Sequence, residues 1–119
     1  MTIAAQQIVD VVNGGIYPAG QALRFTAEFF DFDNNRADPD LVVLRLIAPD
    51  NNQVNYVVGT NAEAVKDTDT HDNGVFRFTP PASAIKGQWL FRIEGQGAVG
   101  AVKEGAYQLL ETRFDLSNP

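Results

Sequence analysis

The sequence ALRFTAEFFDF at residues 22–32 alternates apolar with polar side chains. One face of an extended chain would carry only apolar groups, from Leu23, Phe25, Ala27 and Phe29. The other face would carry Arg24, Thr26 and Glu28. Strict alternation over this length is typical of a β-strand with one buried face. The stretch therefore predicts a strand that covers a hydrophobic core with one face and meets water with the other.

The same pattern recurs on both sides of this stretch. Further strands are expected at LVVLRLIA (41–48), QVNYVV (53–58), GVFRFT (74–79), QWLFRIE (88–94) and residues 106–110. PDNN at 49–52 favours a turn, so the strands that flank it form a predicted hairpin. Residues 8–12 suit a short buried strand about as well as one helical turn, and their β-branched side chains favour the strand. Residues 60–73 read as a long polar connection in which AEAVKD (62–67) suits one helical turn.

Seven short strands without a long amphipathic helix predict an all-β fold, an antiparallel sandwich of the immunoglobulin-like type. The length of 119 residues fits one domain, 1–119. Within it, residues 1–16 are expected to form an amino-terminal strand or arm, and residues 111–119 a carboxy-terminal extension.

Composition excludes several classes of function. The chain has no cysteine, so zinc knuckles, redox pairs and thiol nucleophiles are absent. Fifteen acidic against nine basic residues give a net charge of −6, which argues against nucleic-acid binding. Residues 31–72 hold nine acids and three bases, so this stretch accounts for the whole net charge. The amino terminus has no basic flank and only broken apolar runs, so we expect neither a signal peptide nor a membrane span, and folding in a reducing cytoplasm.

Three motifs could carry chemistry, and each has a simpler reading. Residues 95–100 match G-x-G-x-x-G, but a β-like run follows where a dinucleotide-binding helix would begin, so a glycine-rich connection is favoured and no cofactor is expected. His71 lies in a polar stretch with no evident nucleophile, because the only serines are Ser83 and Ser117. Carboxylate pairs for glycoside hydrolysis depend on distances that the fold sets. We therefore expect no enzyme.

The acidic turn after residue 30 resembles the start of a calcium loop, in which alternate carboxylates can converge on one cation. The candidate ligands are Asp31, Asp33, Asn35, Asp38 and Asp40. Arg36 stands where such loops have glycine, and Val42 stands where they have glutamate. A loop in which Asp and Asn bond to their own backbone is the favoured alternative.

Large apolar side chains interrupt the polar faces of the predicted strands, and they are Phe30, Leu90, Val43 and Ile47. Exposed apolar groups of this size often mark a partner surface. Two other readings carry equal weight: a bulge that shifts the phase by one residue, or a cover of loops and amino-terminal chain.

Several segments together resemble small immunoglobulin-like proteins encoded among the structural genes of tailed phages and prophages. They are Tyr17-Pro18-Ala19-Gly20, the stretch LRFTAEFFDFDNNRADPDLVVLRLIAPDNN (23–52), GVFRFTPP (74–81) and KGQWLFRIEGQGAVGAVKEGAY (86–107). The resemblance covers residues 17–110 and consists of packing and turn signals. It carries over no catalytic or ligand residue.

The resemblance implies a non-enzymatic virion component, present in many copies on a capsid as decoration or on the tail or neck, and made in the host cytoplasm. Our hypothesis is that a face or edge bearing Phe30 or Leu90 docks on another virion protein, while the acidic loops face solvent. The alternative is a carbohydrate-binding or adhesion module that contacts host-surface polysaccharide. The phase of its strand places Trp89 in the core, so Tyr17, Tyr56 and Tyr107 are the aromatic candidates for sugar stacking.

Overall fold

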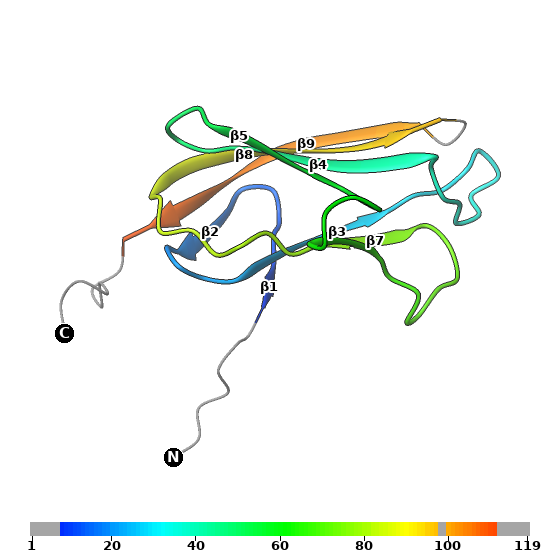
Figure 1. Cartoon of the computed structure of the whole chain (residues 1–119), viewed down its shortest axis with the longest axis horizontal. Helices are drawn as coiled ribbons and strands as arrows, with labels where there is room; N and C mark the ends of the chain where they lie inside the picture. Colours follow the sequence, from blue (N-terminus) through cyan, green and yellow to red (C-terminus); the bar gives the residue numbers. More distant parts are fainter. Residues whose placement is uncertain (1–7, 98–99, 112–119) are drawn as a thin grey trace, which may run out of the picture.

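The computed structural model describes residues 8–97 and 100–111, which form strands, turns and loops and contain no helix. Nine strands are present in this part of the chain (Figure 1). They are β1 (Val9–Asp10), β2 (Gly15–Pro18), β3 (Leu23–Glu28), β4 (Leu41–Ile47), β5 (Gln53–Val57), β6 (Ala64–Lys66), β7 (Val75–Phe78), β8 (Gly87–Gln96) and β9 (Ala101–Leu110). No helix long and apolar enough to cross a membrane occurs within those residues.

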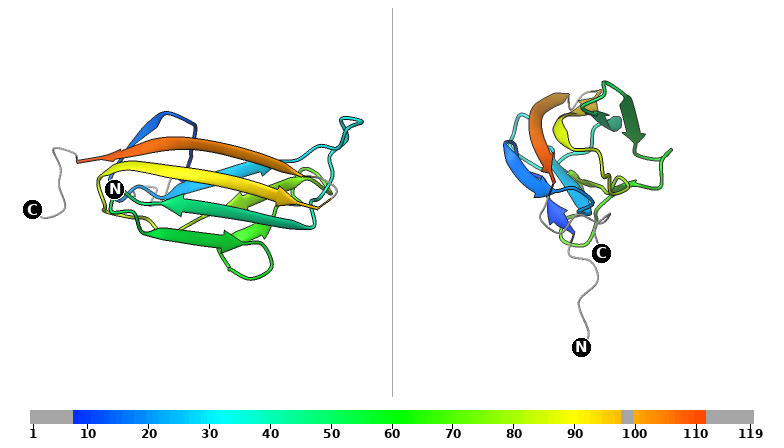
Figure 2. Two further views of the ribbon diagram at one scale, coloured as in Figure 1. Left: turned by 90° about the horizontal axis from the view of Figure 1, so that it is seen from above. Right: turned by 90° about the vertical axis from the view of Figure 1, so that its left-hand side faces the viewer.

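The strands form two sheets that pack as a sandwich (Figures 1 and 2). The four-stranded sheet has the order β1-β3-β7-β6, and the five-stranded sheet has the order β2-β9-β8-β4-β5. Strands β3, β7 and β6 take the positions of B, E and D in an immunoglobulin domain, whereas β9, β8 and β4 take those of G, F and C. The predicted immunoglobulin-like sandwich is confirmed, with nine strands rather than seven.

The amino-terminal segment divides between the two sheets and is the exception to antiparallel pairing. β1 pairs in parallel with β3, through Val9 opposite Leu23, and β2 pairs in parallel with β9. A turn at residues 13–14 separates them, and the Gly15 N–H donates to the Val12 carbonyl at 3.0 Å. The predicted strand at residues 8–12 is confirmed at Val9–Asp10. Residues 1–7 and 112–119, which belong to the predicted arm and extension, lie outside the described residues.

The predicted helical turn at residues 62–67 is wrong. The chain there forms β6, which pairs with β7 and places Ala64 opposite Phe78. Ala64 is buried in the core, so the segment gains both ladder hydrogen bonds and apolar burial. Tertiary pairing therefore overrides the local preference of this short segment for a helix.

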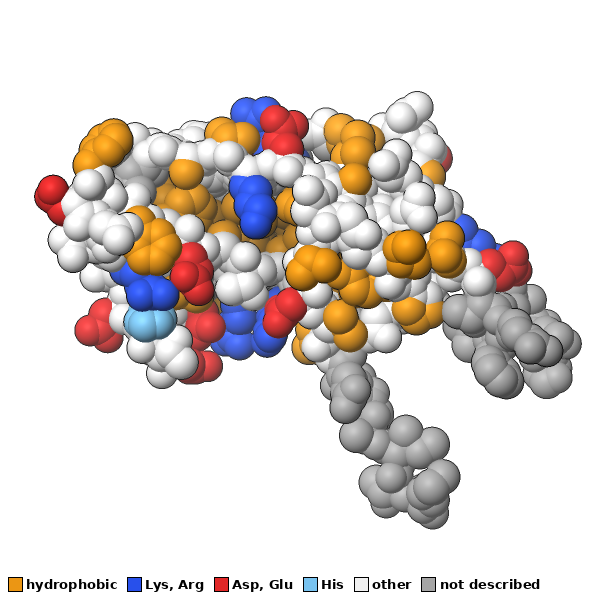
Figure 3. Space-filling model, turned by 180° about the vertical axis from the view of Figure 1, so that it is seen from behind, with side chains coloured by type: hydrophobic (Ala, Val, Ile, Leu, Met, Phe, Trp, Pro, Cys, Tyr) orange, Lys and Arg blue, Asp and Glu red, His pale blue; other side chains and the backbone are white. Residues whose placement is uncertain are grey.

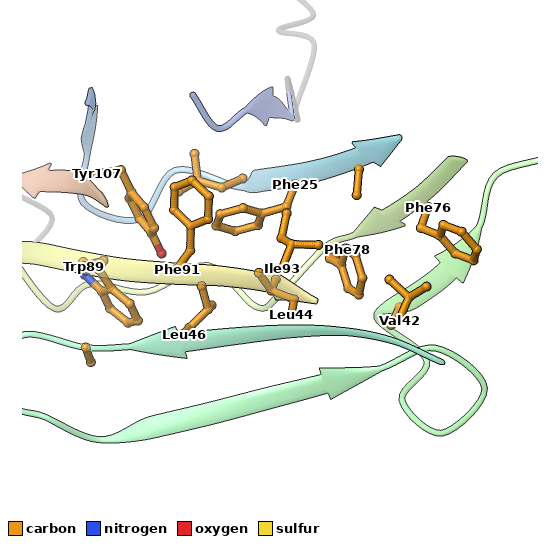
Figure 4. Packing of buried hydrophobic residues seen from close by; sticks show 14 of the residues in the cluster. Phe25, Val42, Leu44, Leu46, Phe76, Phe78, Trp89, Phe91, Ile93 and Tyr107 are labelled. Carbon is orange, nitrogen blue, oxygen red and sulfur yellow. The ribbon is translucent and has the colours of Figure 1, made fainter. Parts of the chain in front are cut away.

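The core lies between the sheets and is rich in aromatic side chains (Figure 4). Phe25, from β3, packs against Phe91, from β8, with ring centroids 5.4 Å apart. Trp89 lies in the core as predicted, stacked on Tyr107 at 6.0 Å, and its indole N–H donates to the Ile85 carbonyl at 3.0 Å. Within the described residues the buried side chains belong to hydrophobic residues, Tyr107 among them, and no charged side chain is buried. The sandwich is thus held together by contact between its two inner faces.

Candidate functional site

The outer face of the five-stranded sheet carries an apolar row that crosses three strands. Leu90 on β8 lies opposite Ile47 on β4 and opposite Ala106 on β9. Leu90 is 45% exposed and Ile47 is partly exposed. We call Ala106, Leu90 and Ile47 the apolar row. The strand register therefore places Leu90 and Ile47 on the outer face, as predicted.

An ion-pair cluster lies beside the apolar row and consists of Arg45, Arg92, Glu94 and Glu104. Glu94 Oε1 accepts from Arg45 Nε at 3.0 Å and from Arg92 Nε at 2.7 Å. Arg92 also reaches Glu104 at 3.4 Å. The Glu94 side chain is only 12% exposed, which limits screening of these pairs by water. The hydrogen bond from Arg45, with further bonds from Gln96 and Arg92, lowers the pKa of Glu94 against the opposing effect of burial.

Replacing Glu94 by glutamine is expected to flatten the acid side of the stability profile. The carboxyl has a lower pKa in the folded state than its ordinary value of 4.5, so its contribution is complete above pH 4.5 and is lost as pH falls below it. Urea unfolding between pH 7 and pH 3 should show a steeper loss of unfolding free energy for the wild type than for Glu94→Gln. Parallel profiles would contradict this assignment. Gln53→Glu, on the same face, provides a control for a surface carboxyl outside the cluster.

Val43 lies on the outer face, as predicted, but the prediction that it is exposed to a partner is wrong. Its side chain lies on the outer face but is only 3% exposed. It sits on a central strand between Val57 of β5 and Glu94 of β8. Glu94, the longer of these two flanking side chains, is held in place by Arg45. Val43 is therefore covered by its neighbours in the sheet.

Phe30 is 43% exposed, as predicted, but it follows β3 of the four-stranded sheet, whereas Leu90 lies on β8 of the five-stranded sheet. It follows β3 and forms an isolated bridge with Arg36. The Arg36 guanidinium lies 5.1 Å from the centroid of the Phe30 ring and also pairs with Glu28 at 3.0 Å. This cation–π contact anchors the loop after β3. The structure therefore does not combine Phe30 and Leu90 into one surface.

The five calcium candidates do not converge. Asp31 Oδ1 accepts hydrogen bonds from the backbone N–H groups of Asp33 and Asn35. This is the favoured alternative of the sequence analysis, a loop whose side chains bond to its own backbone. Asp38 accepts from Gly74 N–H at 2.7 Å and pairs with Lys66 at 2.5 Å. No group of three acidic or histidine side chains suited to a metal ion forms within residues 8–97 and 100–111. Burial opposes ionisation of Asp38, but the bonds from Lys66 and Gly74 outweigh it, and its pKa is lowered.

The other motifs also have structural roles. Gly95 is buried in β8, which ends at Gln96, and β9 begins at Ala101 and pairs with β8, so no helix follows these glycines. Tyr107 is buried against Trp89, and burial raises its pKa. It therefore offers no surface to a sugar. Tyr17 and Tyr56 remain partly exposed, and Tyr17 packs edge-on to Tyr107 at 6.3 Å.

A hollow of about 650 Å³, which we call the side groove, opens between β3 and β9. Figure 3 shows this side of the molecule, with hydrophobic atoms in the floor of the hollow and a basic side chain across it. His71 lies on its rim, and Ser83 is not among its lining residues. The groove therefore does not assemble the serine–histidine pair of a hydrolase from Ser83. The sequence carries one signal for the groove: the apolar alternation is missing at residues 101–105.

Comparison with known proteins found no family model and no curated protein that matches this chain.

Proposed function

We propose that the chain is a non-enzymatic immunoglobulin-like module that attaches to a larger protein assembly through the outer face of its five-stranded sheet. The observation that carries this proposal is the exposure of Leu90 in the middle of the apolar row, on a strand paired on both sides. A large apolar group at the centre of an ordered face is the kind of anchor that protein interfaces bury.

The ion-pair cluster fits the same use. Interfaces commonly place an apolar centre beside a rim of polar groups whose bonds are satisfied. Arg45 and Arg92 both bond to Glu94, and Arg92 also pairs with Glu104, so the cluster balances two positive charges with two negative ones and a partner that covers it need not supply a counter-charge. The face is therefore suited to a protein surface rather than to a polyanion.

The setting that we propose is the virion of a tailed phage, on the capsid or on the tail or neck, and it rests on the resemblance over residues 17–110. The acidic loops 31–40 and 67–72 lie together at one end of the sandwich, away from the carboxy-terminal end of β9 (Figure 1). Docking through the sheet face would leave this acidic end in solvent. Synthesis in the host cytoplasm and assembly in many copies belong to the same proposal.

Leu90→Asp is expected to abolish incorporation into purified particles while the domain stays folded. A carboxylate at this position would be buried without a partner in the interface, but it faces water in the free domain. Val65→Asp is the matched control, because Val65 is similarly exposed at 43% on β6 of the other sheet. Mass spectrometry of particles gives the occupancy, and circular dichroism checks the fold. Normal occupancy of Leu90→Asp would refute the proposal.

The alternative from another class, a carbohydrate-binding module, has less support. Tyr107, one of its three candidate tyrosines, stacks on Trp89 inside the core, and Tyr17 packs against Tyr107. Binding on a glycan array that Leu90→Asp leaves unchanged and Tyr56→Ala removes would favour the alternative.

A further inference from the structure

The outer edge of β9 is paired at one end and free at the other. β2 pairs with β9 from Tyr107 to Leu110. The next residue, Ala106, donates its N–H to Asn13 Oδ1 at 3.0 Å and accepts from Gly14 N–H at 2.7 Å. From Ala101 to Gly105, no described strand pairs with this edge.

The direction of the free backbone groups follows from Ala106. In an antiparallel ladder, alternate residues direct both N–H and C=O to the same side of the strand. Ala106 directs its groups away from β8, so Glu104 and Val102 do the same. The free edge therefore offers two N–H donors and two C=O acceptors at the spacing that an added strand requires.

The inner face of the same stretch leaves space. Ala101, Lys103 and Gly105 lie opposite Gly95, Ile93 and Phe91, so β9 adds no large apolar side chain to the core before Tyr107. A Cβ on Gly105 would lie 2.5 Å from the Phe91 ring, so the groove closes at that point. Beyond it, the side groove opens over Ala27, Phe29 and Ile93 (Figure 3).

Lys103 is the one lysine or arginine lining the groove that has no ion pair among the described residues. The other charged residues that line it are paired: Arg24 with Asp10 at 2.6 Å, Arg77 with Asp67 at 3.3 Å, and Glu28 with Arg36 at 3.0 Å. Lys103 lies on the inward side of β9 and has no ion pair with any described residue. An occupant that brings a carboxylate to this position would satisfy it.

We propose that the side groove binds an extended acidic segment of a partner protein, which adds as a strand to the free edge of β9 at residues 101–105. Val102 and Glu104 bond to its backbone, its apolar side chains cover the groove floor, and a carboxylate between them meets Lys103. The added strand follows β2 along the same edge. The opposite wall, β3, is a shorter alternative. Its edge away from β7 pairs with β1 at Leu23 and Arg24, so only the last residues of that edge, from Thr26 to Glu28, have no described strand beside them. This second contact is independent of the apolar row.

The probe is the capped heptapeptide Thr-Val-Thr-Glu-Thr-Val-Thr, with versions that carry glutamine or lysine at the centre. Titration into the ¹⁵N-labelled full chain should shift the backbone amides of Val102 and Glu104 and protect them from hydrogen exchange. The glutamate peptide should bind at least tenfold more tightly than the lysine peptide, with glutamine between them. Equal binding of the three peptides, amide shifts confined to Thr26 and Glu28, or no shifts at all would overturn the proposal.

Two variants separate the charge from the backbone edge. Lys103→Glu should reverse the preference between the peptides, whereas Lys86→Glu, which makes the same charge change on an exposed lysine, should not. Val102→Pro removes an N–H that faces away from β8 and should abolish binding, and Val102→Thr should retain it. Leu90→Asp should leave peptide binding unchanged, which distinguishes this site from the apolar row. Protection of Val102 that rises with protein concentration, without peptide, would assign the edge to a second copy and overturn the proposal.

Discussion

Replacing Phe78 by alanine is expected to lower the free energy of unfolding by about 3–5 kcal/mol, the range for truncating a fully buried aromatic side chain. Phe78 has no exposed surface and lies between Phe25 on β3 and Ala64 on β6 (Figure 4). Its ring therefore holds three strands of the four-stranded sheet against the opposite layer. The surrounding strands are fixed by their ladders, so the space left by the ring would not close completely.

Urea unfolding of Phe78→Ala and Phe32→Ala measures this directly. Phe32 is fully exposed, so the same substitution there should change the unfolding free energy by less than about 0.5 kcal/mol. The slope of free energy against urea should stay the same in both variants, which would show that the compactness of the states is unchanged. A loss below about 1 kcal/mol for Phe78→Ala would contradict the central position of this residue in the core.

The core could be predicted from sequence because the long strands are half-buried. Alternation placed Phe25, Phe78, Trp89 and Ile93 on inner faces, and each is buried. In a strand with one solvent-exposed face, the alternation of apolar and polar side chains shows which face meets the core, whichever strands lie beside it. The turns needed no partner either, because proline, asparagine and glycine act locally.

Two features could not be predicted in this way. They are β6 and the parallel pairing of the amino-terminal strands, β1 with β3 and β2 with β9. β6 has only three residues, and its strand conformation depends on β7, which lies beside it. Local composition at residues 62–67 suits a helical turn, and pairing with Phe78 outweighs that preference. The crossing of the amino-terminal segment between sheets depends on the free edges of β3 and β9, which are distant in sequence.

The candidate surfaces show the same limit. The phase of β8 correctly predicted that Leu90 is exposed. The same argument failed for Val43, which lies between Val57 and Glu94 on adjacent strands and is only 3% exposed. The carboxylates of the acidic turn are close in sequence, but hydrogen bonds direct Asp31 to its own loop and Asp38 to Lys66. The side groove exists because β1 pairs only with the start of β3 and β2 pairs only with the end of β9. Neither boundary is evident from composition.

Gly74→Ala is expected to lower the free energy of unfolding by about 2–5 kcal/mol, as the sum of a backbone cost and a steric cost. Gly74 has φ +85°, where a side chain costs about 1–2 kcal/mol. A Cβ there would also lie 2.7 Å from the Phe29 carbonyl oxygen and 3.1 Å from the Ala37 nitrogen. Both are backbone atoms in a loop with fixed bonds, so relief of the clash should cost about a further 1–3 kcal/mol.

The Gly74 position joins the two acidic loops at one end of the sandwich. Its N–H donates to Asp38 at 2.7 Å, and its carbonyl accepts from Phe29 N–H at 2.8 Å. A shift of this residue would therefore weaken the link between the loop after β3 and the loop before β7. We expect faster hydrogen exchange at Phe29 and Gly74 amides in a Gly74→Ala variant that still folds.

Gly59→Ala separates the two causes, because Gly59 has a similar φ of +91° and no atom lies within 4 Å of the position that a Cβ would take there. That variant should lose only about 1–2 kcal/mol, the cost of the backbone conformation. The difference between the variants, measured by urea unfolding under the same conditions, is the cost of the contact with Phe29 and Ala37. Equal losses would mean that the two loops adjust freely, and that the bonds through Gly74 do not fix the acidic end of the sandwich.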